Sequence, residues 1–163
     1  MIRKCTSKDL ERMLEIINDA AAVYKGVIPS ECWKEPYMPA DELWHEICEG
    51  VVFWGFEQGG ELKGVMGIQE LEKVTLIRHA YVAGSEQGKG VGGRLLKHLL
   101  KRARNQVLVG TWEAAHWAVA FYRKHGFVIK EKEETARLLQ AYWKIIPSHA
   151  AASVVLSLER RGK

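Results

Sequence analysis

The chain has 163 residues, of which 47% are hydrophobic and 27% are charged, and it carries a formal net charge of +4. This composition is that of one globular domain and excludes a largely disordered chain. The longest apolar run, residues 51–56, is too short to cross a bilayer, and the N-terminus lacks the apolar stretch of a signal peptide, so we expect a cytoplasmic protein with no membrane partner. The mild positive charge favours an anionic ligand without requiring a nucleic acid.

The three cysteines, Cys5, Cys32 and Cys48, are odd in number and widely spaced. This pattern gives neither a disulfide framework nor a zinc site, and we expect no bound metal. The cysteines are instead typical of small hydrophobic residues in a reducing compartment.

The first half of the chain is predicted to contain two helices and an antiparallel meander. Ser7 is a good N-cap for a helix whose apolar residues recur every three or four positions to about Tyr24, and residues 41–49 show the same spacing. A loop with three of the four prolines joins these helices. The predicted strands of this half are residues 2–5, 51–57, 62–71 and 74–82.

The second half alternates between helical and strand patterns. A helix with apolar residues on one side and basic residues on the other is predicted from Val91 to about Arg104, and we interpret its basic side as solvated rather than nucleic-acid-binding. The remaining predicted elements are strand 107–111, helix 114–125, strand 127–130, helix 133–144 and strand 153–159. We treat residues 1–163 as one domain, with 133–144 a helical insertion before the last strand.

A glycine-rich loop, Gln87-Gly88-Lys89-Gly90-Val91-Gly92-Gly93, lies between a predicted strand and a predicted helix. Glycines let the backbone approach a ligand closely, and the start of a helix carries free N–H groups and partial positive charge. Lys89 and Arg94 add full positive charges. The loop therefore predicts a phosphate-binding site.

Several known loops compete for this interpretation. A Walker loop is excluded because Lys89 precedes Gly90 and no Ser or Thr follows the lysine. The glycines also match the Rossmann pattern, with Glu113 at about the expected distance, but the loop follows a meander rather than the first strand of a parallel sheet. The remaining alternative is a flexible turn without function.

Two motifs resemble those of the GNAT superfamily of N-acetyltransferases. The segment Gln87-x-x-Gly90-x-Gly92 is similar to the family's pyrophosphate-binding signature, and it follows a hydrophobic strand that ends Ala80-Tyr81-Val82. The segment Ala118-x-x-Phe121-Tyr122-x-x-x-Gly126-Phe127 is similar to the family's later helix and strand. Ala115 stands where the family commonly has Asn, which is a departure from the pattern.

The resemblance implies an α/β domain with a central mixed, mostly antiparallel sheet of about seven strands, flanked by helices and splayed between the fourth and fifth strands. It implies transfer of an acetyl group from acetyl-CoA to a primary amine in a ternary complex. Arg123 or Lys124 would be further phosphate ligands. The residues expected to bind the coenzyme are Ala80, Tyr81, Val82, Gln87, Gly88, Lys89, Gly90, Val91, Gly92, Gly93 and Arg94.

The resemblance also assigns catalytic candidates. Tyr122 matches the family's tyrosine and is the expected general acid for the leaving thiolate. His79, on the fourth strand, is the candidate base that removes a proton from the acceptor. Glu70, Glu72 and Glu113 are alternative bases.

The parts of the chain that shape the acceptor pocket in this family are rich in aromatic residues here. Because aromatic walls suit apolar or cationic groups, the acceptor is expected to be a small-molecule amine. We expect Trp44 and Trp117 to pack in the core, and Tyr142 and Trp143 to form a candidate lid. The sequence leaves open whether the protein forms a homodimer. Two other functions also remain open, namely an acyl-CoA sensor without catalysis and a dinucleotide-dependent oxidoreductase.

Overall fold

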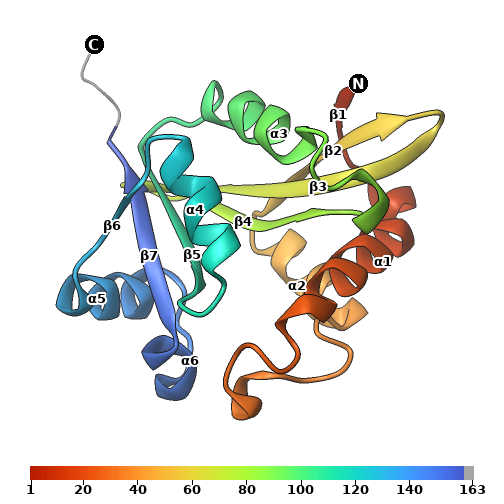
Figure 1. Cartoon of the computed structure of the whole chain (residues 1–163). Coiled ribbons are helices and arrows are strands. Elements are labelled where there is room, and N and C mark those ends of the chain that lie inside the picture. Colours follow the sequence, from red (N-terminus) through yellow and green to blue (C-terminus); the bar gives the residue numbers. More distant parts are fainter. Residues whose placement is uncertain (160–163) are drawn as a thin grey trace.

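A seven-stranded sheet forms the centre of the computed structural model, which describes residues 1–159 (Figure 1). Its strand order is β1-β2-β3-β4-β5-β7-β6, and only the β4–β5 pair is parallel. The strands are β1 (Ile2–Lys4), β2 (Val52–Gln58), β3 (Glu61–Glu70), β4 (Val74–Val82), β5 (Gln106–Trp112), β6 (Val128–Ile129) and β7 (Ser153–Leu158). The predicted mixed, mostly antiparallel sheet is confirmed.

Six α-helices flank the sheet within the described residues. They are α1 (Leu10–Ala21), α2 (Ala40–Cys48), α3 (Val91–Leu100), α4 (His116–Lys124), α5 (Lys132–Tyr142) and α6 (Pro147–Ala151). None of the helices in residues 1–159 has the length and apolar character needed to cross a membrane.

The helices divide between the two faces of the sheet, as their buried side chains require. On α3 the residues Val91, Leu95 and Leu99 are buried in one core cluster, which also holds Tyr122 of α4. The opposite face is covered by α1 and α2, and by α5 further along the sheet. Figure 1 shows α3 above the strands and α1, α2 and α5 below them.

Strands β4 and β5 separate part of the way along their length. Their parallel pairing covers residues 74–77 against 106–109 and then stops. Beyond this point β4 pairs only with β3, through Arg78, Tyr81 and Val82, while the end of β5 stays paired with β7. The strands thus form the predicted splay between the fourth and fifth strands, with main-chain groups along the inner edge of β4 that no strand covers.

The segment between β6 and β7 differs from the prediction. The predicted helix 133–144 is α5, whose Leu138 and Leu139 are buried against β4, β5 and β7, and α6 was not predicted. Trp143 packs against Gly110 of β5, 3.3 Å from the position of a Cβ added there. This helix is therefore a fixed part of the core, an arrangement that does not fit a mobile lid.

Gly67 of β3 has no room for a side chain. A Cβ at this position would lie 2.8 Å from Val51 Cγ1 and 3.0 Å from the carbonyl oxygen of Arg78. We expect Gly67→Ala to lower the free energy of unfolding by about 1–3 kcal/mol, because backbone and buried atoms must move to accept the methyl group. Chemical denaturation measures the change. Gly84→Ala is the control, since its Cβ would meet only Asp19 Oδ2 at 3.9 Å, and an equal loss in both variants would contradict the prediction.

Candidate active site

A cleft of about 900 Å³ lies where the end of α1, the end of β4, the glycine loop and helices α3 and α4 meet. It collects residues that are far apart in the sequence, from Ala20 to His125. Of the residues expected to bind the coenzyme from residue 80 to residue 94, all but Lys89 line this cleft, and so does Tyr122, whereas His79 does not. The loop, the end of β4 and Tyr122 therefore belong to one site.

The start of α3 presents free main-chain N–H groups to this cleft. Gly90 is the N-cap residue, and both Gly88 (φ +81) and Gly90 (φ +83) adopt left-handed conformations that favour glycine. The amides of Gln87 and Lys89 are used inside the loop, since they donate to carbonyls at 3.3 and 3.4 Å. Between Gln87 and Arg94, five amides donate to no acceptor in the described part of the chain, namely those of Gly88, Gly90, Val91, Gly92 and Gly93. We call these five amides the anion cradle.

The anion cradle is open to a ligand. A Cβ added to Gly88 or Gly90 would meet no atom within 4 Å, so the space above both residues is free. The side chain of Gln87 turns back and donates from Nε2 to the carbonyl oxygen of Val82 at 3.1 Å, which ties the loop to the end of β4. The signature glutamine thus shapes the loop in this structure.

Charged side chains surround the cradle. Arg94, Lys97 and Lys124 line the cleft, and the guanidinium of Arg94 lies 4.7 Å from the ring centre of Phe56. One carboxylate, Glu86, also lines the cleft, and its Oε1 lies 3.7 Å from Lys89 Nζ. Lys89 therefore offsets the charge of Glu86 at the rim, and the balance around the cradle is positive.

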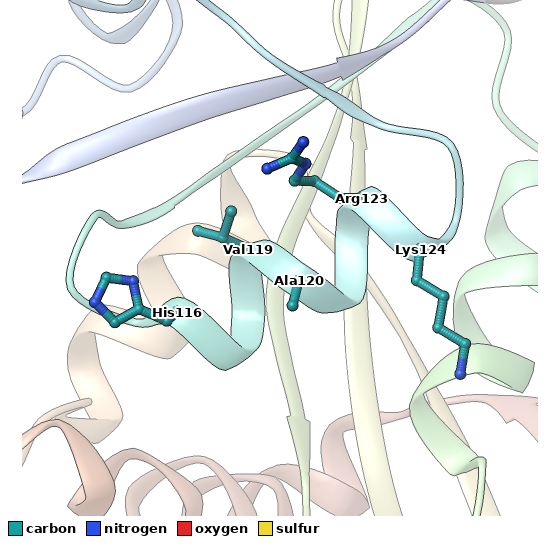
Figure 2. Close-up of a pocket in the computed structure, with 5 residues that line it drawn as sticks. All are labelled: His116, Val119, Ala120, Arg123 and Lys124. Atoms are coloured by element: carbon teal, nitrogen blue, oxygen red, sulfur yellow. The ribbon is translucent and has the colours of Figure 1, made fainter.

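The two basic residues at the end of α4 have different positions. Lys124 lines both the cleft and a separate, shallow hollow of about 540 Å³ on the outside of the helix, whereas Arg123 lines the hollow and not the cleft. Figure 2 shows the two side chains leaving the helix in different directions. Of the two predicted phosphate ligands, only Lys124 is placed to serve.

Tyr122 is buried and lines the same cleft, with its side chain between Phe121 and Phe127 at centroid distances of 5.1 and 5.4 Å. Its hydroxyl group has no hydrogen-bond partner in residues 1–159. Every polar side-chain atom of that range that is shielded from solvent does have a partner, so this oxygen is not fully shielded. The hydroxyl oxygen is therefore accessible from the cleft. Burial raises the pKa of Tyr122 above its usual value, so the group stays protonated at neutral pH.

His79 lies outside the cleft lining, one residue before Ala80, which does line it. A hydrogen bond of 2.5 Å joins its Nε2 to Oε1 of Glu46 on α2. The ring also stacks on Phe53, with 6.1 Å between ring centres. The base candidate is thus on the α2 face of the sheet, at the splay, and Glu46 is a partner that the sequence did not indicate.

The alternative bases are not in the cleft. Glu70 accepts hydrogen bonds from Thr75 Oγ1 and from the amide of Arg104, which gives it a role in holding the turns at the far end of β4. Glu72 and Glu113 are exposed. His79 is outside the cleft lining as well, but it is the neighbour in the chain of Ala80, which lines the cleft.

Aromatic side chains cluster beside the splay. The indole Nε1 of Trp112 donates to the hydroxyl of Tyr37 at 2.8 Å, and Tyr24 lies against Tyr37 and Tyr81. Trp117 of α4 stacks on Tyr24 at 6.0 Å between ring centres and lines the cleft. Burial raises the pKa of Tyr37 to about 12, so this hydroxyl is neutral at physiological pH.

Two tryptophans are more exposed than predicted. Trp44 and Trp117 are 50% and 48% exposed, although their helical spacing indicated the core. The spacing identifies the side of a helix but not what covers it, and α4 turns Trp117 toward the cleft mouth. The prediction of core packing for these two residues is therefore wrong.

Some cleft residues had no signal in the sequence. Ala20 and Val23 come from the end of α1, and Met66 comes from β3. In the sequence these positions are ordinary apolar residues, and only the fold brings them beside the glycine loop. Ala115, where the family commonly has Asn, is fully buried at the N-cap of α4 and makes no side-chain hydrogen bond.

Comparisons with known proteins identify the family of this chain. The family model described as an acetyltransferase (GNAT) domain matches residues 14–140. The PaiA N-acetyltransferase of Thermoplasma acidophilum, solved in complex with coenzyme A, has a TM-score of 0.75 at 18% identity, with 98% of each chain covered. The ribosomal-protein-S18-alanine N-acetyltransferase of Escherichia coli gives a TM-score of 0.69 at 18% identity, over 100% of this chain and 96% of that one.

A third solved structure is similar over part of its length. It is the N-acetylglutamate synthase of Neisseria gonorrhoeae, complexed with coenzyme A and N-acetyl-glutamate, with a TM-score of 0.69 and 20% identity. The similarity covers 100% of this chain and 35% of that one. Because the chain matches this family, the glycine loop is not the loop of a Rossmann fold. The chain belongs to the GNAT acetyltransferase domain family and is an acyltransferase.

Proposed function

We propose that this protein transfers the acetyl group of acetyl-CoA to the primary amine of a small-molecule acceptor, by direct attack of the amine while both substrates are bound. The observation that carries the proposal is the anion cradle, which opens into a cleft that reaches Tyr122 beside the splay of β4 and β5. The cradle and the basic residues fit a pyrophosphate. The coenzyme A bound in the Thermoplasma structure supports the choice of donor.

The uncovered edge of β4 suits the amide-rich arm of the coenzyme. Residues 78–82 have no strand partner on the β5 side, so their main-chain groups can pair with amides of the ligand as an added strand would. This arrangement would hold the thioester at the splay, within reach of both faces of the sheet.

Tyr122 is the proposed acid. A tyrosine of pKa ~10 is a weaker acid than a thiol of pKa ~8.5, and burial widens this gap. The role that fits is a hydrogen bond from the hydroxyl group to the sulfur as negative charge develops there. Desolvation raises the pKa of the leaving thiolate as well, which allows the proton to follow. A hydroxyl without another partner is free to make this bond.

His79 is the proposed base. A primary amine of pKa ~10 is mostly protonated at neutral pH, and it must lose a proton before it can attack. His79 lies on the α2 face of the splay and Tyr122 on the α3–α4 face. The two groups can therefore act on opposite sides of the reacting carbonyl.

The aromatic cluster supports an acceptor with an apolar or aromatic body. Tyr24, Tyr81 and Trp117 line the cleft near Tyr122, and no acidic side chain belongs to this wall. Ring faces pack well against apolar groups and attract an ammonium ion. We therefore place arylalkylamines first among the acceptors to be tested.

A turnover assay tests the proposal. The protein is incubated with acetyl-CoA and, in turn, phenethylamine, a linear diamine, glycinamide and a short peptide with a free N-terminus, while released thiol and product mass are measured. We expect amine-dependent thiol release and an acetylated product. Binding of acetyl-CoA without product from any of these amines would favour the sensor function instead.

A further inference from the structure

The backbone of β4 is distorted at His79. Val65 pairs with Tyr81 and Gly67 with Arg78, so β4 holds one residue more than β3 between these pairs. His79 occupies this bulge with a left-handed backbone (φ 54). A non-glycine residue rarely adopts this conformation, and bulges commonly redirect a side chain beside an active site. The distortion turns the imidazole toward α2.

Glu46 holds the redirected imidazole in place. Its Oε1 lies 2.5 Å from Nε2 of His79 and 3.5 Å from the guanidinium of Arg78. The side chains of Glu46 and His79 are 14% and 17% exposed. Burial opposes ionisation of Glu46, but the hydrogen bond from His79 and the nearby positive charges lower its pKa below the usual value. Glu46 is therefore a carboxylate at neutral pH.

An ionised carboxylate can only accept a hydrogen bond, which fixes the tautomer of the ring. Nε2 of His79 must carry the proton, and in the neutral ring Nδ1 then holds the lone pair. Nδ1 has no hydrogen-bond partner in residues 1–159, whereas every polar side-chain atom of that range that is shielded from solvent has one. The basic nitrogen is therefore accessible to water.

Among the described residues, Glu46 is the only carboxylate that contacts His79. Arg78 from β4 and His45 from α2 are the other charged or titratable groups that act on Glu46. Phe53 of β2 stacks on the ring, and Gln69 of β3 binds Arg78 at 3.2 Å. Because Gln69 and Glu46 both contact Arg78, the guanidinium keeps a partner when the charge of Glu46 is removed.

We propose, on the basis of the function proposed above, that Glu46 is the positioning residue of the catalytic base. It holds His79 with Nε2 protonated, so that Nδ1 takes a proton from the acceptor ammonium, directly or through one water. The N–H bond of the ammonium breaks, an Nδ1–H bond forms, and the neutral amine is free to attack. The carboxylate stabilises the resulting imidazolium, which then returns its proton to solvent.

Glu46→Gln tests the proposal, with Glu49→Gln as the matched control. Glu49 ends the same helix and its side chain is exposed, so its substitution removes an equal charge without touching His79. The ring tautomer is measured by ¹⁵N–¹H correlation of the histidine side chains, without any acceptor. We expect the Nε2–H form of His79 in the wild type and in Glu49→Gln, and a mixture of forms in Glu46→Gln.

The kinetic arm uses phenethylamine and the other amines of the turnover panel. We expect Glu46→Gln to lower kcat about tenfold with little change in the KM for acetyl-CoA, and to move the acid limb of the pH–rate profile to lower pH. Glu49→Gln should behave as the wild type. An Nδ1–H tautomer in the wild type, or the same pH profile in both variants, would overturn the role of Glu46. A wild type that acetylates none of the amines would overturn the proposed function itself.

Discussion

Gly90→Asp is expected to abolish measurable binding of acetyl-CoA. The new carboxylate would stand at the N-cap of α3, in the open space above the anion cradle. Two like charges 4 Å apart near a protein surface repel by about 4 kcal/mol, and 1.4 kcal/mol corresponds to a factor of ten in affinity. We therefore expect a loss of at least about a hundredfold in affinity, measured by calorimetry.

Two control variants separate charge from backbone strain. Gly90→Asn adds similar bulk at the same left-handed position without the charge, and it should bind more tightly than Gly90→Asp. Gly59→Asp places the same residue at another exposed left-handed glycine (φ +62), in the β2–β3 hairpin, and should bind acetyl-CoA normally. Unchanged affinity in Gly90→Asp would show that the cradle does not hold the coenzyme.

Tyr122→Phe is expected to lower kcat by about a hundredfold while the dissociation constant of acetyl-CoA stays nearly the same. The phenylalanine ring keeps the packing against Phe121 and Phe127, so the change removes the hydroxyl group alone. Steady-state kinetics with the acceptor that responds in the turnover panel gives kcat, and calorimetry gives the affinity.

Tyr142→Phe is the matched control for this change, because Tyr142 ends α5 and packs against another core cluster. The control should keep the kcat of the wild type. Burial raises the pKa of Tyr122, so its ionisation should cause no loss of activity as the pH rises toward the ordinary tyrosine value. A Tyr122→Phe variant with the turnover of the wild type at every pH would remove the hydroxyl group from the mechanism.

Local patterns predicted most of the elements, because each pattern reflects burial on one side. The alternating and apolar runs at 62–71 and 74–82 became β3 and β4 within one residue at each end. The apolar spacing in the helix from Val91 gave its buried side correctly, although the helix ends at Leu100 instead of Arg104. Boundaries depend on the last backbone hydrogen bonds, which side-chain spacing does not record.

The position and open backbone of the glycine loop were predicted, but its internal hydrogen bonds were not. The glycines at 88 and 90 indicated a backbone open to an anion, and both are left-handed and exposed. The amides of Gln87 and Lys89 proved to be engaged within the loop. Which amides remain free depends on the turns that the loop makes, and the sequence pattern is compatible with more than one set.

The parts that could not be predicted depend on tertiary contacts. Glu46 and His79 are 33 residues apart, on a helix and a strand, and no spacing rule connects them. The bulge that turns His79 toward α2 also breaks the alternation from which its direction would be inferred. The burial of one side of α5, in contrast, could have been inferred from the sequence, since Leu138 and Leu139 are adjacent apolar residues within a polar helix.

Titration of the ¹⁵N-labelled protein with acetyl-CoA, followed by backbone amide resonances, tests the central claim most directly. If the anion cradle holds the coenzyme, the largest shifts will be those of Gly88, Gly90, Val91, Gly92 and Gly93, while the amide resonance of Gly59 in the β2–β3 hairpin will not move. Saturable binding with the largest shifts elsewhere in the protein, or no binding at all, would contradict the account.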